Sequence, residues 1–136
     1  MCEWEIRLQR ESQEGNLRRE KKRTAIAFEL IGDPQVVFLD EPTSGLDSLT
    51  AYVVVSYMKK LAEDAGKTIV MTIHQPGTEI YDLFDTLILM VAGRIVYQGP
   101  AASAVNYFSV MGFNCPTYSN PSDYFMQITH LESKKN

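Results

Sequence analysis

Two carboxylates stand side by side at the end of an apolar run, in the segment VVFLDEPTSGLD, residues 36–47. Asp40 and Glu41 repel each other unless a cation or a proton lies nearby, because like charges at short range disfavour joint ionisation. Carboxylate oxygens bind Mg²⁺, and a carboxylate can also take a proton from water. The pair therefore suggests a cation site with a general base; two acids that cap a turn are the alternative interpretation.

The residues around this pair predict a strand–helix–strand unit. Residues 35–40 form an apolar run without alternation, which is typical of a parallel strand that is covered on both faces. Ser48 can cap a helix that runs to about Ala65 and ends in the segment Ala65-Gly66-Lys67. Residues 68–74, TIVMTIH, predict a second buried strand.

The lengths of these elements decide how they connect. A helix of about 17 residues covers about 25 Å, and a strand of about seven residues covers about 23 Å. The helix therefore returns the chain to the edge from which it began, so the two strands run parallel. Parallel strands end at one edge, where open α/β sheets bind ligands. We therefore expect Asp40, Glu41 and His74 to converge on one ligand.

The N-terminal region is polar over residues 1–16 and predicts a weakly ordered lead-in, followed by a helix over residues 20–31 that stops at Gly32. The C-terminal half predicts shorter elements. A helix over 78–85 is followed by a strand–turn–strand over 86–99 with Ala92-Gly93-Arg94 as its turn. A helix then runs from 101 to a stop at Gly112, and Asn120 caps a last helix with Pro121 and Asp123 in its first turn. The aromatic residues of this half are expected to be packing residues: Tyr97, Tyr107, Phe108, Tyr124 and Phe125.

Composition limits the function classes. The 136 residues suffice for one domain, and no apolar run approaches the roughly 18 residues of a membrane span. Residues 1–23 carry seven Lys and Arg against five Asp and Glu, whereas the rest carries six against twelve. A nucleic-acid binder is basic over its surface, so no nucleic-acid partner is expected, and RREKKR at 18–23 is better explained as a solvated helix start. Cys2 and Cys115 are far apart in sequence, which favours free thiols.

The segments DEPTSGLDS and TIHQP together resemble the ATP-binding-cassette (ABC) transporter ATPases. In that family the strand and its acids form the Walker B motif, SGLD forms the D-loop, and the following histidine is the switch. The resemblance implies that Asp40 holds Mg²⁺, usually through water, and that Glu41 is the general base. It also implies that His74 lies beside the γ-phosphate of ATP, where an imidazole can hydrogen-bond an oxygen and orient the water.

The same resemblance implies a partner. Ser44, Gly45, Leu46 and Asp47 would form the contact with a second nucleotide-binding domain, in a homodimer or heterodimer of half-transporters. Gly45 allows the close backbone approach that such a contact needs. A transporter membrane domain is the other implied partner, and the implied cofactors are ATP and Mg²⁺.

Three further segments resemble the G subfamily, the half-transporters whose ATPase precedes the membrane domain: HQP, LFDTLILMVAGRIVYQGP and GFNCPTYSNPSDYFMQI. The resemblance covers residues 20–136, which we expect to be the C-terminal part of a nucleotide-binding domain at the cytoplasmic face of a membrane. Residues 1–19 would be a poorly ordered lead-in with a degenerate signature. The implied fold is α/β, a partial P-loop NTPase fold whose parallel strand–helix–strand core is followed by a β-hairpin and C-terminal helices.

Two departures from the family bear on activity. The 136 residues contain no G-x-x-x-x-G-K-[ST] segment, whose backbone N–H groups and lysine hold the β- and γ-phosphates. Where the family signature has Ser-Gly-Gly before Glu20, this chain has Leu17, Arg18 and Arg19. We therefore expect the isolated chain to have no measurable ATPase activity.

Three functions stay open on these residues. The first is part of the ATPase domain of a G-type transporter that couples ATP hydrolysis to export. The second is a non-catalytic remnant that acts as an interaction module with intact half-transporters. The third, a soluble ABC ATPase of translation or chromosome maintenance, is disfavoured by HQP and NPSDYF. No residue here specifies a transported substrate.

Overall fold

The computed structural model describes residues 20–21, 24–28 and 30–133. The predicted lead-in over residues 1–19, with Leu17, Arg18 and Arg19 and with Cys2, lies outside the described residues. The chain divides into two compact units between His74 and Gln75, and each unit is described by itself. None of the helices in the described part has the length and apolar character needed to cross a membrane.

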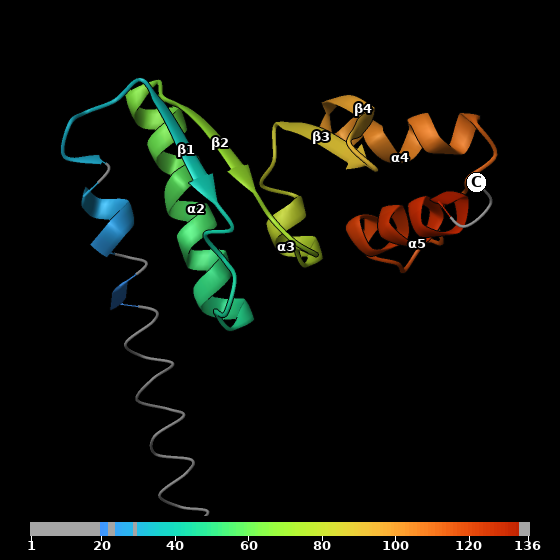
Figure 1. The fold of residues 1–136 in the computed structure, drawn as a ribbon, viewed down its shortest axis with the longest axis horizontal. Coiled ribbons are helices and arrows are strands. Elements are labelled where there is room, and N and C mark those ends of the chain that lie inside the picture. Colours follow the sequence, from blue (N-terminus) through green and yellow to red (C-terminus); the bar gives the residue numbers. More distant parts are fainter. Residues whose placement is uncertain (1–19, 22–23, 29, 134–136) are drawn as a thin grey trace, which may run out of the picture. The chain divides into compact units, whose positions relative to one another are not determined.

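The first unit contains β1 (Val36–Asp40), α2 (Ser48–Ala65) and β2 (Thr68–Thr72) (Figure 1). β1 and β2 pair in parallel, from Val36 opposite Thr68 to Asp40 opposite Thr72. The predicted parallel strand–helix–strand unit is therefore confirmed. Gly66 ends α2 in the left-handed conformation with φ 62°, which a residue without a Cβ adopts at little cost.

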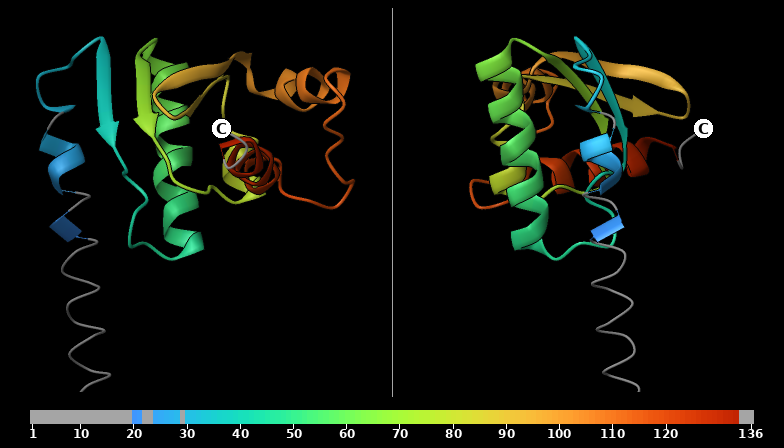
Figure 2. Two further views of the ribbon diagram at one scale, coloured as in Figure 1. Left: turned by 45° about the vertical axis from the view of Figure 1, so that its right-hand side comes forward. Right: turned by 90° about the vertical axis from the view of Figure 1, so that its left-hand side faces the viewer.

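Helices cover one face of this two-stranded sheet. Figure 2 shows α2 running alongside both strands. Val37 and Leu39 of β1 are buried against Met58 of α2. The remaining apolar side chains of this core come from β2 and from the helical residues ahead of β1: Ile69, Met71, Ile26 and Leu30.

The opposite face of the sheet is exposed. Val36, Phe38 and Val70 have exposed fractions of 47%, 75% and 43%. The prediction that both faces of the strands are covered is therefore wrong for the described residues. An apolar run without alternation shows that both faces can be buried, but the described helices form a layer on one face only.

A buried lysine joins the beginnings of the two strands. Lys67 follows α2, and its Nζ donates hydrogen bonds to Asp33 Oδ1 at 2.5 Å and to the Pro34 carbonyl oxygen at 2.8 Å. Asp33 has a φ of 48°, so the left-handed residue after the first helical segment is Asp33 rather than the predicted Gly32. The lysine charge is balanced where the chain enters β1.

The second unit begins with α3 (Thr78–Tyr81), which is shorter than the predicted helix over 78–85. β3 (Thr86–Val91) and β4 (Arg94–Pro100) then form the predicted antiparallel hairpin. Its turn is Ala92-Gly93 alone, with φ angles of 49° and 76°, because Arg94 already belongs to β4. Two consecutive left-handed residues match the twist of a hairpin.

Two helices complete this unit, α4 (Ala101–Val110) and α5 (Pro121–Ser133). The predicted cap of α5 is confirmed, since Asn120 Oδ1 accepts a hydrogen bond from the Ser122 amide at 3.2 Å. Asn120 Nδ2 also donates to the Pro76 carbonyl oxygen at 2.8 Å. This bond ties the start of α5 to the segment before α3.

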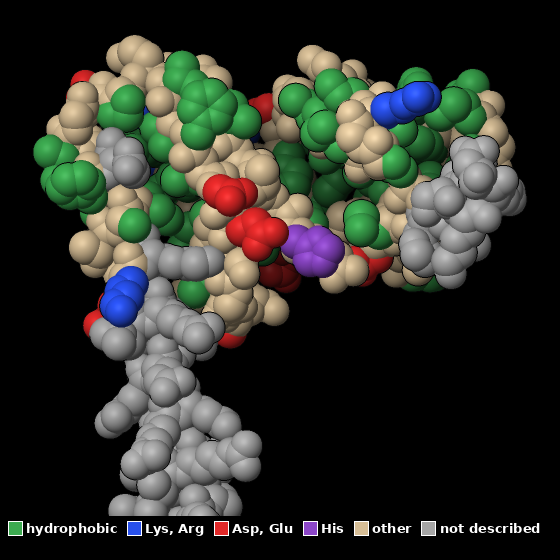
Figure 3. Space-filling view, viewed as in Figure 1, with side chains coloured by type: hydrophobic (Ala, Val, Ile, Leu, Met, Phe, Trp, Pro, Cys, Tyr) green, Lys and Arg blue, Asp and Glu red, His purple; other side chains and the backbone are tan. Residues whose placement is uncertain are grey.

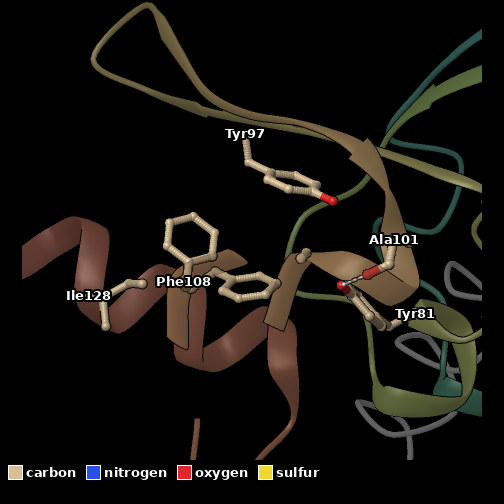
Figure 4. Close-up of a cluster of buried hydrophobic side chains, with 7 residues drawn as sticks. Tyr81, Tyr97, Ala101, Phe108 and Ile128 are labelled. Atoms are coloured by element: carbon tan, nitrogen blue, oxygen red, sulfur yellow. Dashed lines mark hydrogen bonds between the residues drawn. The ribbon is translucent and has the colours of Figure 1, made fainter. Parts of the chain in front are cut away.

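Aromatic side chains dominate the core of the second unit (Figure 4). The prediction that the aromatic residues of this half pack is confirmed for Tyr97, Phe108 and Phe125, which are buried. Tyr107 is 44% exposed, and its ring lies 5.1 Å from that of Tyr97. The other buried members are Tyr81, Ala101, Ala104 and Ile128.

The hydroxyl of Tyr81 is satisfied within this core. Tyr81 Oη donates a hydrogen bond to the Ala101 carbonyl oxygen at 2.8 Å (Figure 4). Burial, followed by the negative charges that Tyr97, Asp82 and Cys115 can carry, raises the pKa of Tyr81 to about 12. Cys115 is a free thiol, as predicted, and burial raises its pKa as well.

The raised pKa of Tyr81 predicts a loss of stability at alkaline pH. The unfolded phenol ionises near pH 10 but the folded one only near pH 12, so the unfolded state binds fewer protons between these values. The free energy of unfolding should therefore fall as pH rises through this window. Tyr81→Phe should lower stability by about 1 kcal/mol at pH 8 and reduce the alkaline slope. Urea titrations at pH 8 and pH 11 measure both effects.

Tyr118→Phe is the matched control, because this tyrosine is 101% exposed and should leave the slope unchanged. An alkaline slope in Tyr81→Phe as steep as in the unchanged protein would contradict the assignment to Tyr81.

The exposed face of the β1–β2 sheet predicts self-association. Apolar sheet surface that faces water favours contact with a second such surface. We expect the purified chain to associate with rising concentration and Phe38→Ser to weaken that association, as measured by sedimentation velocity. Tyr118→Ser, which removes an even more exposed aromatic from another segment, should have no such effect. A monodisperse monomer at all concentrations would refute this expectation.

Candidate functional site

The carboxyl edge of the β1–β2 sheet holds the two predicted acids. Asp40 is the last residue of β1 and lies opposite Thr72, the last residue of β2. Thr72 Oγ1 donates a hydrogen bond to Asp40 Oδ1 at 2.6 Å and accepts one from the Glu41 amide at 2.8 Å. One hydroxyl on the second strand therefore contacts both acidic residues at the end of the first.

Glu41 has a backbone conformation that few side chains adopt. Its φ is 45°, in the left-handed region that a residue with a Cβ enters at a cost. The chain leaves the strand direction at this residue, and Glu41 is exposed. The turn places the second acid immediately outside the sheet, one residue after Asp40.

A compact turn connects the acids to α2. The Ser44 amide donates to the Glu41 carbonyl oxygen at 3.2 Å, and the Leu46 amide donates to that of Thr43 at 3.1 Å. Gly45 lies at φ 73°, which explains a glycine at this position. Ser44 and Gly45 are both exposed, so their surface is open to a partner.

Asp47 has a structural role in the described residues. It is the N-cap of α2, where its Oδ1 accepts from the Thr50 amide at 3.0 Å and its Oδ2 accepts from Thr50 Oγ1 at 2.8 Å. The cap predicted for Ser48 is therefore wrong by one residue. A carboxylate accepts both bonds at once and complements the positive end of the helix.

His74 lies beyond the strand in which it was predicted. β2 ends at Thr72, so the predicted strand over 68–74 is two residues too long. Because β1 and β2 are parallel, both strands end at the same edge of the sheet. The exposed His74 follows β2 at this edge, where β1 ends with Asp40. Figure 3 shows acidic side chains next to a histidine side chain on one face.

The donor set fits Mg²⁺ bound through water. Among the side chains that the structure describes, no three of His, Cys, Asp or Glu gather closely enough to hold a metal ion. Mg²⁺ keeps several of its waters and takes one or two carboxylates together with substrate phosphates. Asp40 is exposed and has one oxygen oriented by Thr72, which suits this kind of site.

The sequence alone misleads at Lys67 and gives no signal at Thr72. The letters Gly66-Lys67-Thr68 match the end of a phosphate-binding loop, but the Lys67 amine is engaged by Asp33 and Pro34. Thr72 was missed as a site residue. Its hydroxyl is recognisable only once the strand register places it opposite Asp40.

A solved structure with a similar fold defines the class of protein. The structure of CbiO1 from Clostridium perfringens, described as part of an ABC transporter complex, matches with a TM-score of 0.58 and 28% identity. The match covers 85% of this chain and 43% of that chain. The described elements thus resemble part of the α/β fold of an ABC ATPase.

Sequence comparisons narrow the class to a family. A family model described as an ABC-2 type transporter matches residues 74–135. The broad substrate specificity ATP-binding cassette transporter ABCG2 of Sus scrofa is 48% identical over 84% of this chain and 17% of its own length. The white protein of Drosophila melanogaster is 49% identical over 80% of this chain and 16% of its own length. ABC transporter G family member 13 of Arabidopsis thaliana is 50% identical over 83% of this chain and 16% of its own length.

The chain therefore belongs to the G subfamily of ABC transporters. It spans about 16–17% of the length of these relatives.

Substitutions of Asp47 should separate its cap from any other role. Asp47→Ala should lower the free energy of unfolding by about 1 kcal/mol, because it removes the acceptor for Thr50. Asp47→Asn should retain most of the stability, since asparagine is a good N-cap. Asp64→Ala, in the last turn of the same helix, is the control and should not destabilise. Urea unfolding followed by circular dichroism measures these values; an Asp47→Ala variant as stable as the unchanged chain would contradict the cap assignment.

Proposed function

We propose that this chain supplies the metal and water side of an ATP site in a G-type ABC transporter, which couples ATP hydrolysis to export. The observation that carries the proposal is the pair Asp40 and Glu41, fastened by Thr72 at the carboxyl edge of a parallel sheet. Open α/β sheets bind ligands at this edge. His74 follows the second strand at the same edge.

Each side chain has a role that its position allows. Asp40 holds Mg²⁺ through water, with the carboxylate that Thr72 orients. Glu41 accepts a proton from the attacking water, and His74 donates a hydrogen bond toward the γ-phosphate. Bound Mg-ATP supplies the phosphoryl group together with the cation that balances its charge.

The exposed surfaces suggest where partners contact the chain. Ser44, Gly45 and Asp47 lie in the turn that we assign to a second nucleotide-binding domain. The exposed face around Phe38 takes the remaining part of the ATPase fold, since this chain covers 43% of the similar solved ATPase chain. The assembly then lies at the cytoplasmic face of a membrane, next to the membrane domain of the transporter.

A second function rests on a specific feature of the sequence. The 136 residues contain no G-x-x-x-x-G-K-[ST] segment, the usual source of the groups that hold β- and γ-phosphates. A non-catalytic chain would then act as an interaction module for intact half-transporters through residues 44–47. Both functions use the same turn, so measurements of hydrolysis distinguish them.

The catalytic proposal predicts two results. The purified chain should show no magnesium-dependent ATP hydrolysis. In a chimera, residues 20–136 of this chain replace the matching segment of ABCG2 from Sus scrofa. The chimera should hydrolyse ATP, and Glu41→Gln should lower its rate by at least about 100-fold. Phosphate release from the purified chimera measures this.

Glu79→Gln, an exposed acid in the first turn of α3, is the matched control and should leave the rate unchanged. A folded chimera without activity would favour the interaction module. Turnover that survives Glu41→Gln would remove the proposed role of Glu41.

A further inference from the structure

The hydroxyl of Thr72 has fixed hydrogen-bond directions. A backbone N–H can only donate, so the bond from the Glu41 amide at 2.8 Å uses a lone pair of Thr72 Oγ1. The single hydroxyl proton is therefore directed to Asp40 Oδ1 at 2.6 Å. The hydroxyl holds a side-chain oxygen of one acid and the backbone of the next in a single arrangement.

These two hydrogen bonds constrain the orientation of the Asp40 carboxylate and the backbone of Glu41, on which catalysis would depend. The bond to Asp40 fixes the rotation of its carboxylate and engages one of its two oxygens. The bond to Glu41 holds the amide of a residue whose φ of 45° carries a backbone cost, and so helps to keep the residue in that conformation. The direction in which the Glu41 side chain leaves the strand therefore depends on Thr72.

We propose that Thr72 is a positioning residue that sets the geometry of Asp40 and Glu41 for water attack, an inference that rests on the proposed function of these two acids. Thr72 acts through its hydrogen bonds to Asp40 and Glu41. A general base must be held in position within a fraction of an ångström, because small displacements lower the reaction rate by large factors.

The residue type supports this role. Serine would supply the same hydroxyl, whereas valine has nearly the same shape without it. Both threonine and valine are β-branched and suit a strand. Thr68 lies on the same face of β2, opposite Val36, and is exposed as Thr72 is. Thr68→Val therefore repeats the chemical change at the other end of the strand.

The first test uses the 136-residue chain without nucleotide. Thr72→Val should make hydrogen exchange of the Glu41 amide about tenfold faster or more, because a net hydrogen bond of ordinary strength is lost. Thr72→Ser should restore slow exchange, and Thr68→Val should not change it. Amide exchange followed by NMR measures this. Equal protection of Glu41 in Thr72→Val and in the unchanged chain would overturn the proposal.

The second test measures catalysis in the chimera with ABCG2 of Sus scrofa. Thr72→Val should lower kcat about tenfold or more with little change in KM, since it alters the alignment of the base rather than nucleotide binding. Thr72→Ser should recover kcat, which a loss of packing would not explain. Thr72→Ala replaces Thr72→Val in both tests if the valine variant does not fold.

The two proposals fail in different ways. If Glu41→Gln leaves the chimera active, the proposed function fails. Amide exchange still shows whether the Thr72 hydroxyl holds the Glu41 amide. If Glu41→Gln abolishes turnover but Thr72→Val does not change kcat, the positioning role fails and the proposed function stands.

Discussion

The register of β1 against β2 is the constraint on which the first unit depends. It places Val37 and Leu39 on the face that α2 covers and sets Asp40 opposite Thr72. Side chains alternate between faces along a strand, so a slip by one residue would move the buried pair into water. The same slip would separate Asp40 from the hydroxyl that orients it. Burial of the core and geometry of the acids are therefore fixed together.

The turn between β1 and α2 connects the acids to the helix within a few residues. It begins at Glu41 and ends at Asp47, which caps α2. The cap fixes where the helix begins, and the left-handed Gly45 allows the chain to reach that point. Asp47 thus stabilises the helix while it lies in an exposed surface turn.

Local patterns predicted most of the elements. The parallel strand–helix–strand unit, the hairpin and the Asn120 cap follow from residue types close together in sequence. The misassigned cap at Ser48 and the two extra residues of β2 are boundary errors. Asp47 and Ser48 are adjacent residues that can both cap a helix, and the apolar run of β2 continues through Ile73 although the strand pairing ends at Thr72. Thr72 was not predicted because its role depends on a residue 32 positions away.

Burial was predicted least well, and the reason bears on the site. The run VVFLD is apolar on both faces, and the structure covers one of them, leaving Phe38 75% exposed. At 4 Å, a pair of unit charges interacts by about 1 kcal/mol in water and by about 4 kcal/mol near a protein surface. Asp40 lies on the same exposed face of β1, two residues after Phe38. A layer packed on Phe38 would therefore also withdraw water from Asp40 and strengthen the electrostatic interactions of its carboxylate.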